Sequence, residues 1–271
     1  MMGLIKRWRR TRATERSRID NALWERVLDG LPFLARLSDD DLLRLRQTAA
    51  LFLDDKQMHG ASGFVLTDEI RLSIAVQACL PILNLGLDAY AGWVGIVVYP
   101  AEFRVIRSEP DDDGVVHEWS DELAGESWPG GPIVLSWEDI YSNEPGYNVV
   151  IHEFAHKLDM LSGDADGIPP APQGYAPEAW RDLLGREYER FCAEADAAAV
   201  IAPVGGQESE SETIEIDFDF DPYAAEHPAE FFAVMSEAFF TEPEHVRERY
   251  PALYTAFTAL YRQDPAARTG R

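Results

Sequence analysis

Apolar side chains recur at helical spacing in several stretches of the chain, and a capping residue or a proline precedes most of these stretches. Ser38 stands before three aspartates and an apolar stripe between Leu42 and Leu53, which predicts a helix from about residue 38 into the low fifties. Thr67, followed by two acids, predicts a second helix that Pro81 limits. Further helices are predicted over residues 149–159, 177–199, 228–240 and 243–262.

Two stretches favour β-strands instead. Gly92–Tyr99 is rich in β-branched residues and ends before a proline, and Gly131–Trp137 is a second such run. Between them, Pro110–Gly114 predicts a turn and Val115–His117 the start of another strand. Helices, strands and helices again follow one another without a regular strand-helix alternation. This order predicts an α+β fold with a small mixed sheet.

The composition is that of a protein with a sizeable core, since 46% of the 271 residues are hydrophobic. We expect one compact domain over residues 21–265, followed by a short tail at 266–271. The net charge of −24 excludes direct nucleic-acid binding, because phosphate contacts need clustered Lys and Arg. The two cysteines have no metal-ligand spacing, no apolar run reaches membrane-spanning length, and the N-terminus lacks a signal-peptide core. A soluble, cytoplasmic protein is the expectation.

Two segments depart from the average charge. Residues 6–18 carry seven basic side chains and one acid, so residues 1–20 are predicted to be a basic, flexible leader. Residues 207–221 carry seven acids and no base, which predicts an exposed, mobile insertion. A calcium loop is the alternative for the acidic insertion, but the ligand spacing and central glycine of an EF-hand are missing.

The pentapeptide His152-Glu153-Phe154-Ala155-His156 is the strongest chemical signal in the chain. If this segment is helical, the two histidines lie four residues apart on one face, so both imidazoles can bind one metal ion while Glu153 stands beside an open coordination position. Apolar residues on the opposite face favour such a helix. The alternative is a chance pair of histidines with a glutamate between them. The helical context favours the active site of a zinc hydrolase.

A catalytic zinc needs a third protein ligand. A metzincin would have Gly and His where this chain has Asp159 and Ser162, so a downstream carboxylate is the expected third ligand. Glu178 is one candidate, although an acid at a helix start also complements the helix dipole. Glu230 and Glu237 are seven residues apart and share a helix face, so one could bind the metal while the other holds a ligand imidazole. The spacing does not choose between Glu230 and Glu237.

Several segments resemble the Mlc titration factor A family of bacterial zinc peptidases. They include Gly131–Trp137, His152–Asp159 and Tyr223–Phe240, and shared features run from about residue 31 to residue 265. The resemblance implies a zincin-like fold, similar to the catalytic core of anthrax lethal factor. It also implies a set of site residues: zinc held by His152, His156 and Glu230, Glu153 as the base, and Tyr223 near the reacting carbonyl. The leader lies outside the resemblance, and the acidic insertion is longer than the family suggests.

The predicted activity is zinc-dependent peptide hydrolysis, of aminopeptidase type, linked to the regulation of sugar uptake. Glu153 accepts a proton from the attacking water, and Tyr223 donates a hydrogen bond to the developing oxyanion. The strand at 133–137 is expected to be an edge strand that pairs with an extended substrate. Asp159 is expected either to orient a ligand histidine or to be an exposed acid.

A function of another class is binding. The family that the chain resembles also captures the glucose repressor Mlc, so the chain could act chiefly by sequestering an Mlc-like repressor. Other enzyme classes have little support, because the sequence contains no Gly-x-Ser-x-Gly elbow, phosphate loop or dinucleotide fingerprint.

Overall fold

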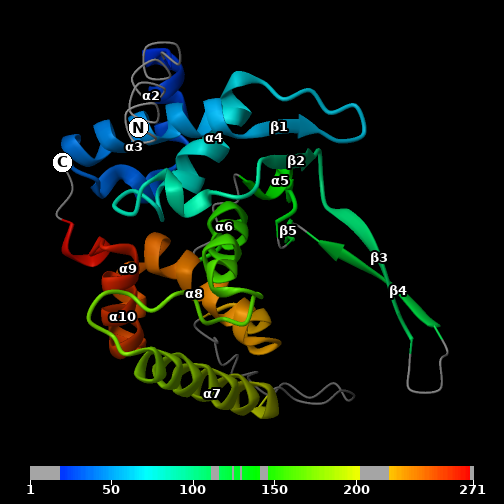
Figure 1. The fold of residues 1–271 in the computed structure, drawn as a ribbon, viewed down its shortest axis with the longest axis vertical. Coiled ribbons are helices and arrows are strands. Elements are labelled where there is room, and N and C mark those ends of the chain that lie inside the picture. The colour runs from blue at the N-terminus through cyan, green and yellow to red at the C-terminus, as the bar shows by residue number, and fades with distance from the viewer. Residues whose placement is uncertain are drawn as a thin grey trace, which may run out of the picture.

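A four-stranded mixed sheet and the helices packed on it form the part of the chain that carries the site (Figure 1). The structure is a computed structural model, and it describes residues 19–110, 116–123, 125–128, 130–140, 146–201 and 220–268. The strands of this sheet are β1 (Gln57–Gly60), β2 (Gly95–Tyr99), β6 (Ile133–Ser136) and β5 (Gly125–Ser127), in that spatial order. β1, β2 and β6 run parallel, and β5 pairs antiparallel with β6.

The α+β class and the small mixed sheet predicted from the sequence are confirmed. The helices are α2 (Asn21–Asp29), α3 (Asp39–Asp55), α4 (Asp68–Cys79), α5 (Trp137–Ile140), α6 (Val149–Asp159), α7 (Pro177–Ile201), α8 (Pro228–Thr241), α9 (Pro243–Arg249) and α10 (Pro251–Tyr261). Short 3-10 turns occur at Pro32–Arg36, Leu87–Tyr90, Met160–Ser162, Pro222–Ala225 (η4) and Pro265–Ala267.

The predicted helix starts are confirmed by their caps. Ser38 accepts a hydrogen bond from the backbone N–H of Asp41 at 3.2 Å, and Thr67 accepts one from Ile70 at 3.2 Å. Helix α2 was not predicted, although Asp20 caps it in the same way. Strand β1 was not predicted either. Because β1 and β2 are parallel, the chain must cross over between them, and α4 lies in this connection.

The single helix predicted over residues 243–262 is wrong. The structure has two helices there, α9 and α10, with Tyr250 between them in a non-helical conformation and Pro251 as the first residue of α10. The physical reason is the proline, which disfavours helical backbone at the preceding residue and cannot donate a backbone hydrogen bond.

A two-stranded antiparallel ribbon projects from the body of the molecule (Figure 1). It consists of β3 (Phe103–Pro110) and β4 (Val116–Leu123), so the strand expected to begin near residue 115 is present. The turn expected at residues 110–114 lies outside the described residues after Pro110. The leader up to residue 18 and the acidic insertion up to residue 219 also lie outside them.

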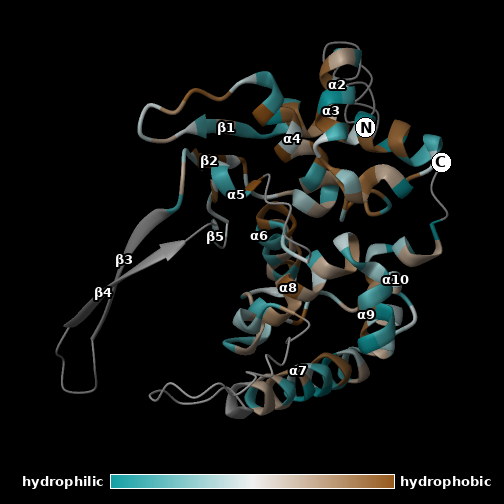
Figure 2. Ribbon diagram, turned by 180° about the vertical axis from the view of Figure 1, so that it is seen from behind, coloured by the Kyte–Doolittle hydropathy of each residue, from teal (hydrophilic) through white to brown (hydrophobic). Residues whose placement is uncertain are grey.

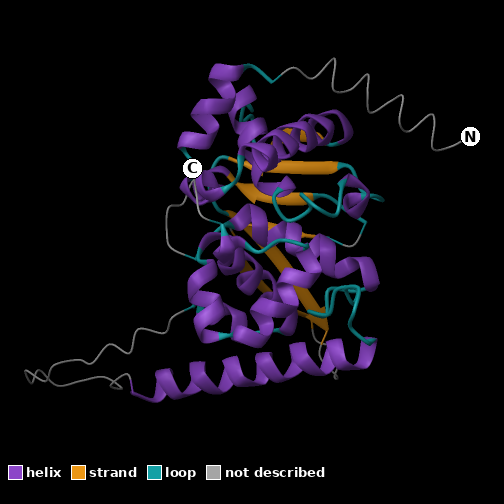
Figure 3. Cartoon of the chain, turned by 90° about the vertical axis from the view of Figure 1, so that its left-hand side faces the viewer, coloured by secondary structure: helices purple, strands orange, loops and turns teal. Residues whose placement is uncertain are grey.

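Helix α7 lies along one end of the molecule (Figure 3). Hydrophobic and hydrophilic residues alternate along it (Figure 2), and Trp180, Leu184 and Phe191 are buried. This pattern is that of an amphipathic helix with one face on the core. Among the described residues, no helix combines the length and the apolar character that crossing a bilayer requires.

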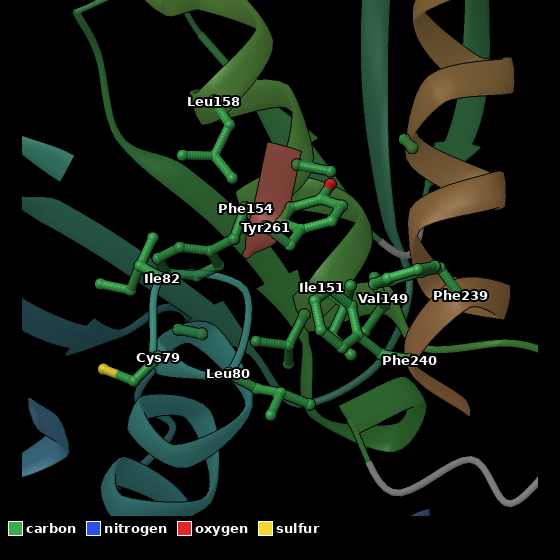
Figure 4. Packing of buried hydrophobic residues seen from close by; sticks show 14 of the residues in the cluster. Cys79, Leu80, Ile82, Val149, Ile151, Phe154, Leu158, Phe239, Phe240 and Tyr261 are labelled. Carbon is green, nitrogen blue, oxygen red and sulfur yellow. The ribbon is translucent and has the colours of Figure 1, made fainter. Parts of the chain in front are cut away.

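Helix α6 is held in place by its apolar face. Figure 4 shows Ile151, Phe154 and Leu158 among buried residues contributed by several other segments of the chain. The ring of Phe154 packs against those of Phe52, Tyr90 and Trp93, with centroids 5.6, 5.1 and 5.7 Å away. A helix seated by such a cluster presents its opposite face in a fixed direction.

Candidate metal centre

Helix α6 starts at a tightly bonded cap. The side chain of Asn148 accepts a hydrogen bond from the backbone N–H of Ile151 at 2.9 Å and donates one to Gln77 of α4 at 2.7 Å. One turn further, the predicted helical spacing brings the rings of His152 and His156 together, with centroids 4.9 Å apart. The two imidazoles therefore share one face of the helix.

Helix α8 packs on α6 and contributes two glutamates that meet different nitrogens of the histidines. Glu230 Oε2 lies 3.0 Å from His152 Nε2 and 3.4 Å from His156 Nε2. Glu237 Oε1 accepts a hydrogen bond from His152 Nδ1 at 2.7 Å, and Glu237 Oε2 accepts one from the backbone N–H of Asn148. Glu230 thus faces the Nε2 atoms of both rings, whereas Glu237 bonds the Nδ1 atom on the far side of the His152 ring.

Glu178, the remaining candidate for the third ligand, is exposed in the first turn of α7. Among the described residues, the group whose ligand atoms lie within 4.8 Å of one another consists of His152, His156 and Glu230. The geometry therefore favours Glu230 over both Glu178 and Glu237.

The spacing of these three ligand atoms fits a metal ion. Tetrahedral zinc with bonds of about 2.1 Å places its ligand atoms about 3.4 Å apart. The three separations here are 3.0, 3.2 and 3.4 Å. Two ring nitrogens and a carboxylate oxygen at such distances repel one another unless protons or a cation lie between them. A proton on His152 can satisfy one neighbouring oxygen, whereas a divalent ion satisfies all three donors.

Burial and neighbouring charges set the ionisation of these groups. Burial opposes charge on His152, but Glu237 and Glu230 raise its pKa well above the ordinary value. Burial also opposes charge on Glu230, but its hydrogen bonds with the two histidines hold its pKa well below the usual range. Burial raises the pKa of Glu153 to about 7, against the lowering effect of the histidines. A carboxylate with that pKa can both accept and release a proton near neutral pH.

The helix face that carries the two histidines opens into a cleft of about 450 Å³. Tyr223, on η4, lines the cleft with its ring centroid 6.4 Å from that of His152, and the residue is 40% exposed. Six carboxylates line the same cleft, belonging to Glu102, Glu126, Glu153, Asp221, Glu230 and Glu237. Neither lysine nor arginine is among the described residues that line it. The cleft is therefore strongly acidic.

The edge strand beside the cleft is not the one expected from the sequence. Strand β6, predicted over 133–137 as the edge, is bonded on both sides, to β2 and to β5, and Trp137 already belongs to α5. The edge is β5, whose Gly125, Glu126 and Ser127 line the cleft. The reason is that three-residue β5, which has no clear sequence signal, covers the edge of β6.

The sequence matches one protein family over nearly its whole length. The model of the glucose-regulated metallo-peptidase M90 family matches residues 5–262. The chain belongs to this M90 family. Mlc titration factor A of Klebsiella pneumoniae subsp. pneumoniae is 40% identical to this M90 chain over 248 residues, which cover 90% of the chain and 87% of the relative. Mlc titration factor A of Serratia proteamaculans is 38% identical over 253 residues, which cover 92% of the chain and 90% of the relative.

The resemblance to this family is thereby confirmed. The expectation that the leader lies outside the resemblance is wrong, because the family match begins at residue 5. M90 membership implies metallopeptidase chemistry and, with it, a metal ion. The cluster of His152, His156 and Glu230 is the candidate metal site among the described residues of the M90 chain.

Asp159 of the M90 chain is fully buried, so the expectation of an exposed acid is wrong. Its Oδ2 accepts a hydrogen bond from the backbone N–H of Gly167 at 2.7 Å, and burial raises its pKa to about 6. No hydrogen bond joins it to the buried Nδ1 of His156, which lacks a partner in the described part of the chain. The carboxylate that bonds the Nδ1 atom of a histidine in the candidate metal site is therefore that of Glu237.

Gly167 is a site-supporting residue that the sequence analysis passed over. Its backbone has a φ of +78°, and a Cβ placed there would lie 2.3 Å from the carbonyl oxygen of Pro228. Pro228 starts α8, the helix that carries Glu230. The hydrogen bond to Asp159 thus ties α6, through Gly167, to the N-terminus of α8. The available signal in the sequence was a glycine directly after Asp166, in a segment that predicts only a loop.

Replacing Gly167 with alanine should weaken metal binding, because the added methyl group pushes the first turn of α8, and Glu230 with it, away from the histidines. Backbone strain at positive φ should also cost about 1–2 kcal/mol of stability. Metal affinity by competition with a chelator and unfolding in urea measure the two effects. Alanine at Gly174, which also has positive φ but nothing within 4 Å of its Cβ, provides the control for strain without displacement. Equal metal affinity in both variants would contradict the role of Gly167.

Proposed function

We propose that the chain is a zinc-dependent peptidase whose metal is held by His152, His156 and Glu230, with Glu153 as the general base. The observation that carries this proposal is the convergence of two Nε2 atoms and one carboxylate oxygen within 3.0–3.4 Å of one another at the wall of an acidic cleft. Two imidazoles and a glutamate form a common ligand set of catalytic zinc.

A zinc ion held there would polarise the substrate carbonyl and lower the pKa of a bound water. Glu153, buried beside the histidines, accepts the proton of the attacking water and then transfers it to the leaving amine. Tyr223 lies at the mouth of the same site and donates a hydrogen bond from its hydroxyl to the developing oxyanion. Glu237 keeps the ring of His152 in the orientation that presents Nε2 to the cleft.

We further propose that an extended substrate pairs its backbone with β5, the edge strand of the sheet beside the cleft. The aminopeptidase type is supported by the charge of the cleft. Glu102, Glu126 and Asp221 line it in addition to the carboxylates of the metal site, and such a surface attracts a positively charged α-ammonium group. The substrate would then be a peptide with a free N-terminus.

Removing the metal tests the proposal. Treatment of the purified protein with a chelator should abolish hydrolysis of a short peptide, and added Zn²⁺ should restore it, because Glu153 by itself provides no electrophile. Mg²⁺, which prefers oxygen ligands, is the control and should not restore activity. An N-acetylated copy of the peptide should be cleaved more slowly. Hydrolysis that survives chelation contradicts the zinc peptidase, whereas equal cleavage of both peptides contradicts only the aminopeptidase type.

The names of the relatives support a second candidate function. Both are called Mlc titration factor A, so we propose that this chain also binds an Mlc-like transcriptional repressor and in this way affects sugar uptake. Such a partner would place the protein in the cytoplasm. Binding and hydrolysis can occur on the same molecule and are separated by the Glu153 variant discussed below.

We also propose that residues 21–265 form a single domain with a zincin-like fold. One cluster of buried hydrophobic residues runs from Trp24 in α2 to Tyr261 in α10, which supports a single unit. The zincin-like fold is supported by the mixed sheet, whose antiparallel edge strand β5 lies beside helix α6.

A further inference from the structure

Strand β5 touches the side chain of Glu153 directly. A Cβ added to Gly125 would lie 2.3 Å from Oε1, 2.7 Å from Cγ and 2.8 Å from Cδ of Glu153, and these are its three nearest atoms. Gly125 does not have a positive φ, so its backbone conformation suits any residue. What requires glycine at this position is therefore the space that the glutamate occupies.

Packing has to help fix the Glu153 carboxylate, because one of its two oxygens lacks a hydrogen bond to any described residue. The residue is 4% exposed, and its Oε2 has no hydrogen-bond partner in the described part of the chain. A buried glutamate with one oxygen unbonded can move between side-chain conformations unless neighbouring atoms prevent it. The bare backbone of Gly125 provides those atoms on the side of the sheet.

A buried lysine holds strand β5 against helix α6. Lys157 lies four residues after Glu153, on the same side of α6, and is 4% exposed. Its Nζ donates hydrogen bonds to the carbonyl oxygens of Trp128 at 2.6 Å and Gly131 at 3.0 Å. Both carbonyls belong to the turn that joins β5 to β6. Hydrogen bonds from a charged donor are about twice as strong as neutral ones, so this contact fastens the turn to α6.

We propose that Gly125 and Lys157 are positioning residues for the general base: Lys157 fastens β5 to α6, and Gly125 presents the surface against which the Glu153 carboxylate lies. The inference rests on the proposed role of Glu153. Since β5 is also the strand proposed to pair with the substrate, one contact sets both the place of the substrate backbone and the place of the carboxylate. Neither residue is a metal ligand.

Alanine at Gly125 tests the first half of the inference. The methyl group should turn the Glu153 side chain away, so kcat for a peptide should fall about 100-fold or more, at nearly unchanged KM and zinc content. A crystal structure of the variant should show Glu153 in another side-chain conformation. Gly95→Ala is the matched control, because Gly95 lies in β2 of the same sheet and its Cβ would meet a side chain of Pro132 at 3.3 Å. Its kcat should stay at the wild-type value.

Shortening the side chain of residue 153 tests whether the loss of kcat in Gly125→Ala comes from the contact between Gly125 and Glu153. Glu153→Asp shortens the side chain by about the volume of the methyl group that Gly125→Ala adds. The carboxylate of the double variant therefore has room beside the new methyl group. Its kcat should be higher than the value obtained by multiplying the fold-losses of the two single variants. Multiplicative effects would overturn the inference. So would wild-type kcat in Gly125→Ala when Glu153→Gln is inactive. If Glu153→Gln itself keeps wild-type activity, the proposed function fails instead.

Lys157→Met tests the second half, with Lys56→Met as its control. Lys56 is also buried, donates to two carbonyls, those of Tyr90 at 2.6 Å and Trp93 at 2.7 Å, and lies over the same Trp93 ring as Lys157. Both variants should lose stability. In zinc-loaded protein, hydrogen exchange of the β5 amides should accelerate and kcat should fall in Lys157→Met and not in Lys56→Met. Equal changes in both variants would overturn the role of Lys157.

Discussion

Replacing Glu230 with alanine should remove the metal from the purified protein, whereas alanine at Glu237 should leave a weaker site that still binds it. Glu230 brings an oxygen to both ring nitrogens, so its loss removes a ligand. Glu237 contacts the other nitrogen of His152, and loss of such an outer contact costs about 10–100-fold in metal affinity. We expect the loss at Glu230 to exceed 100-fold. Elemental analysis of dialysed protein and chelator competition measure both.

The control for this pair is alanine at Glu178, which is exposed at the start of α7 and should leave metal binding at the wild-type level. Loss of zinc from the Glu237 variant, together with normal zinc in the Glu230 variant, would reverse the assignment of the ligand.

Replacing Glu153 with glutamine should lower peptide hydrolysis by about 10²–10⁴-fold, because the amide cannot accept a proton from water. Zinc content should stay the same, since the glutamate is not among the three converging ligand atoms. The side chains are similar in size, so the buried position should tolerate the change. Initial rates on a short peptide and the metal content of the same sample check this expectation.

The same variant separates the two candidate functions. If repressor binding is independent of hydrolysis, the glutamine variant should bind an Mlc-like repressor as tightly as the wild type does. Hydrolysis at the wild-type rate would show that another group is the base. Loss of repressor binding would show that capture depends on the intact active site.

Helix α6 could be predicted from the sequence because its signals are local. The spacing of His152 and His156, the apolar positions between them and the helix period are all properties of eleven consecutive residues, Val149–Asp159. The starts of α3, α4 and α8 were equally accessible, since capping residues and prolines act on the turn that follows them.

The choice between Glu230 and Glu237 could not be made in the same way. Two residues seven apart on one helix point in nearly the same direction, so both were expected to face the histidines. Which carboxylate reaches Nε2 and which reaches Nδ1 depends on where α8 crosses α6, and that crossing is a property of the packed core. Here the family resemblance, and not residue spacing, pointed to Glu230.

The short strands escaped prediction for a related reason. β1 has four residues and β5 three, too few for alternation of polar and apolar positions to be visible, and both exist because a neighbouring strand offers a free edge. The edge role was consequently assigned to β6. The importance of Gly125 and Lys157 likewise depends on contacts between β5 and α6 that no local pattern reveals.

The cluster of aromatic rings around Phe154 should make the fold independent of bound metal. Many structural zinc sites supply the folding energy of their domains, so those domains unravel when the ion leaves. Here the helix that bears the histidines packs against Phe52, Tyr90 and Trp93, and Glu237 accepts a hydrogen bond from Nδ1 of His152. We therefore expect the metal-free protein to stay folded and to bind metal again later. The supply of free metal in the cell would then set the amount of active protein, with no new synthesis.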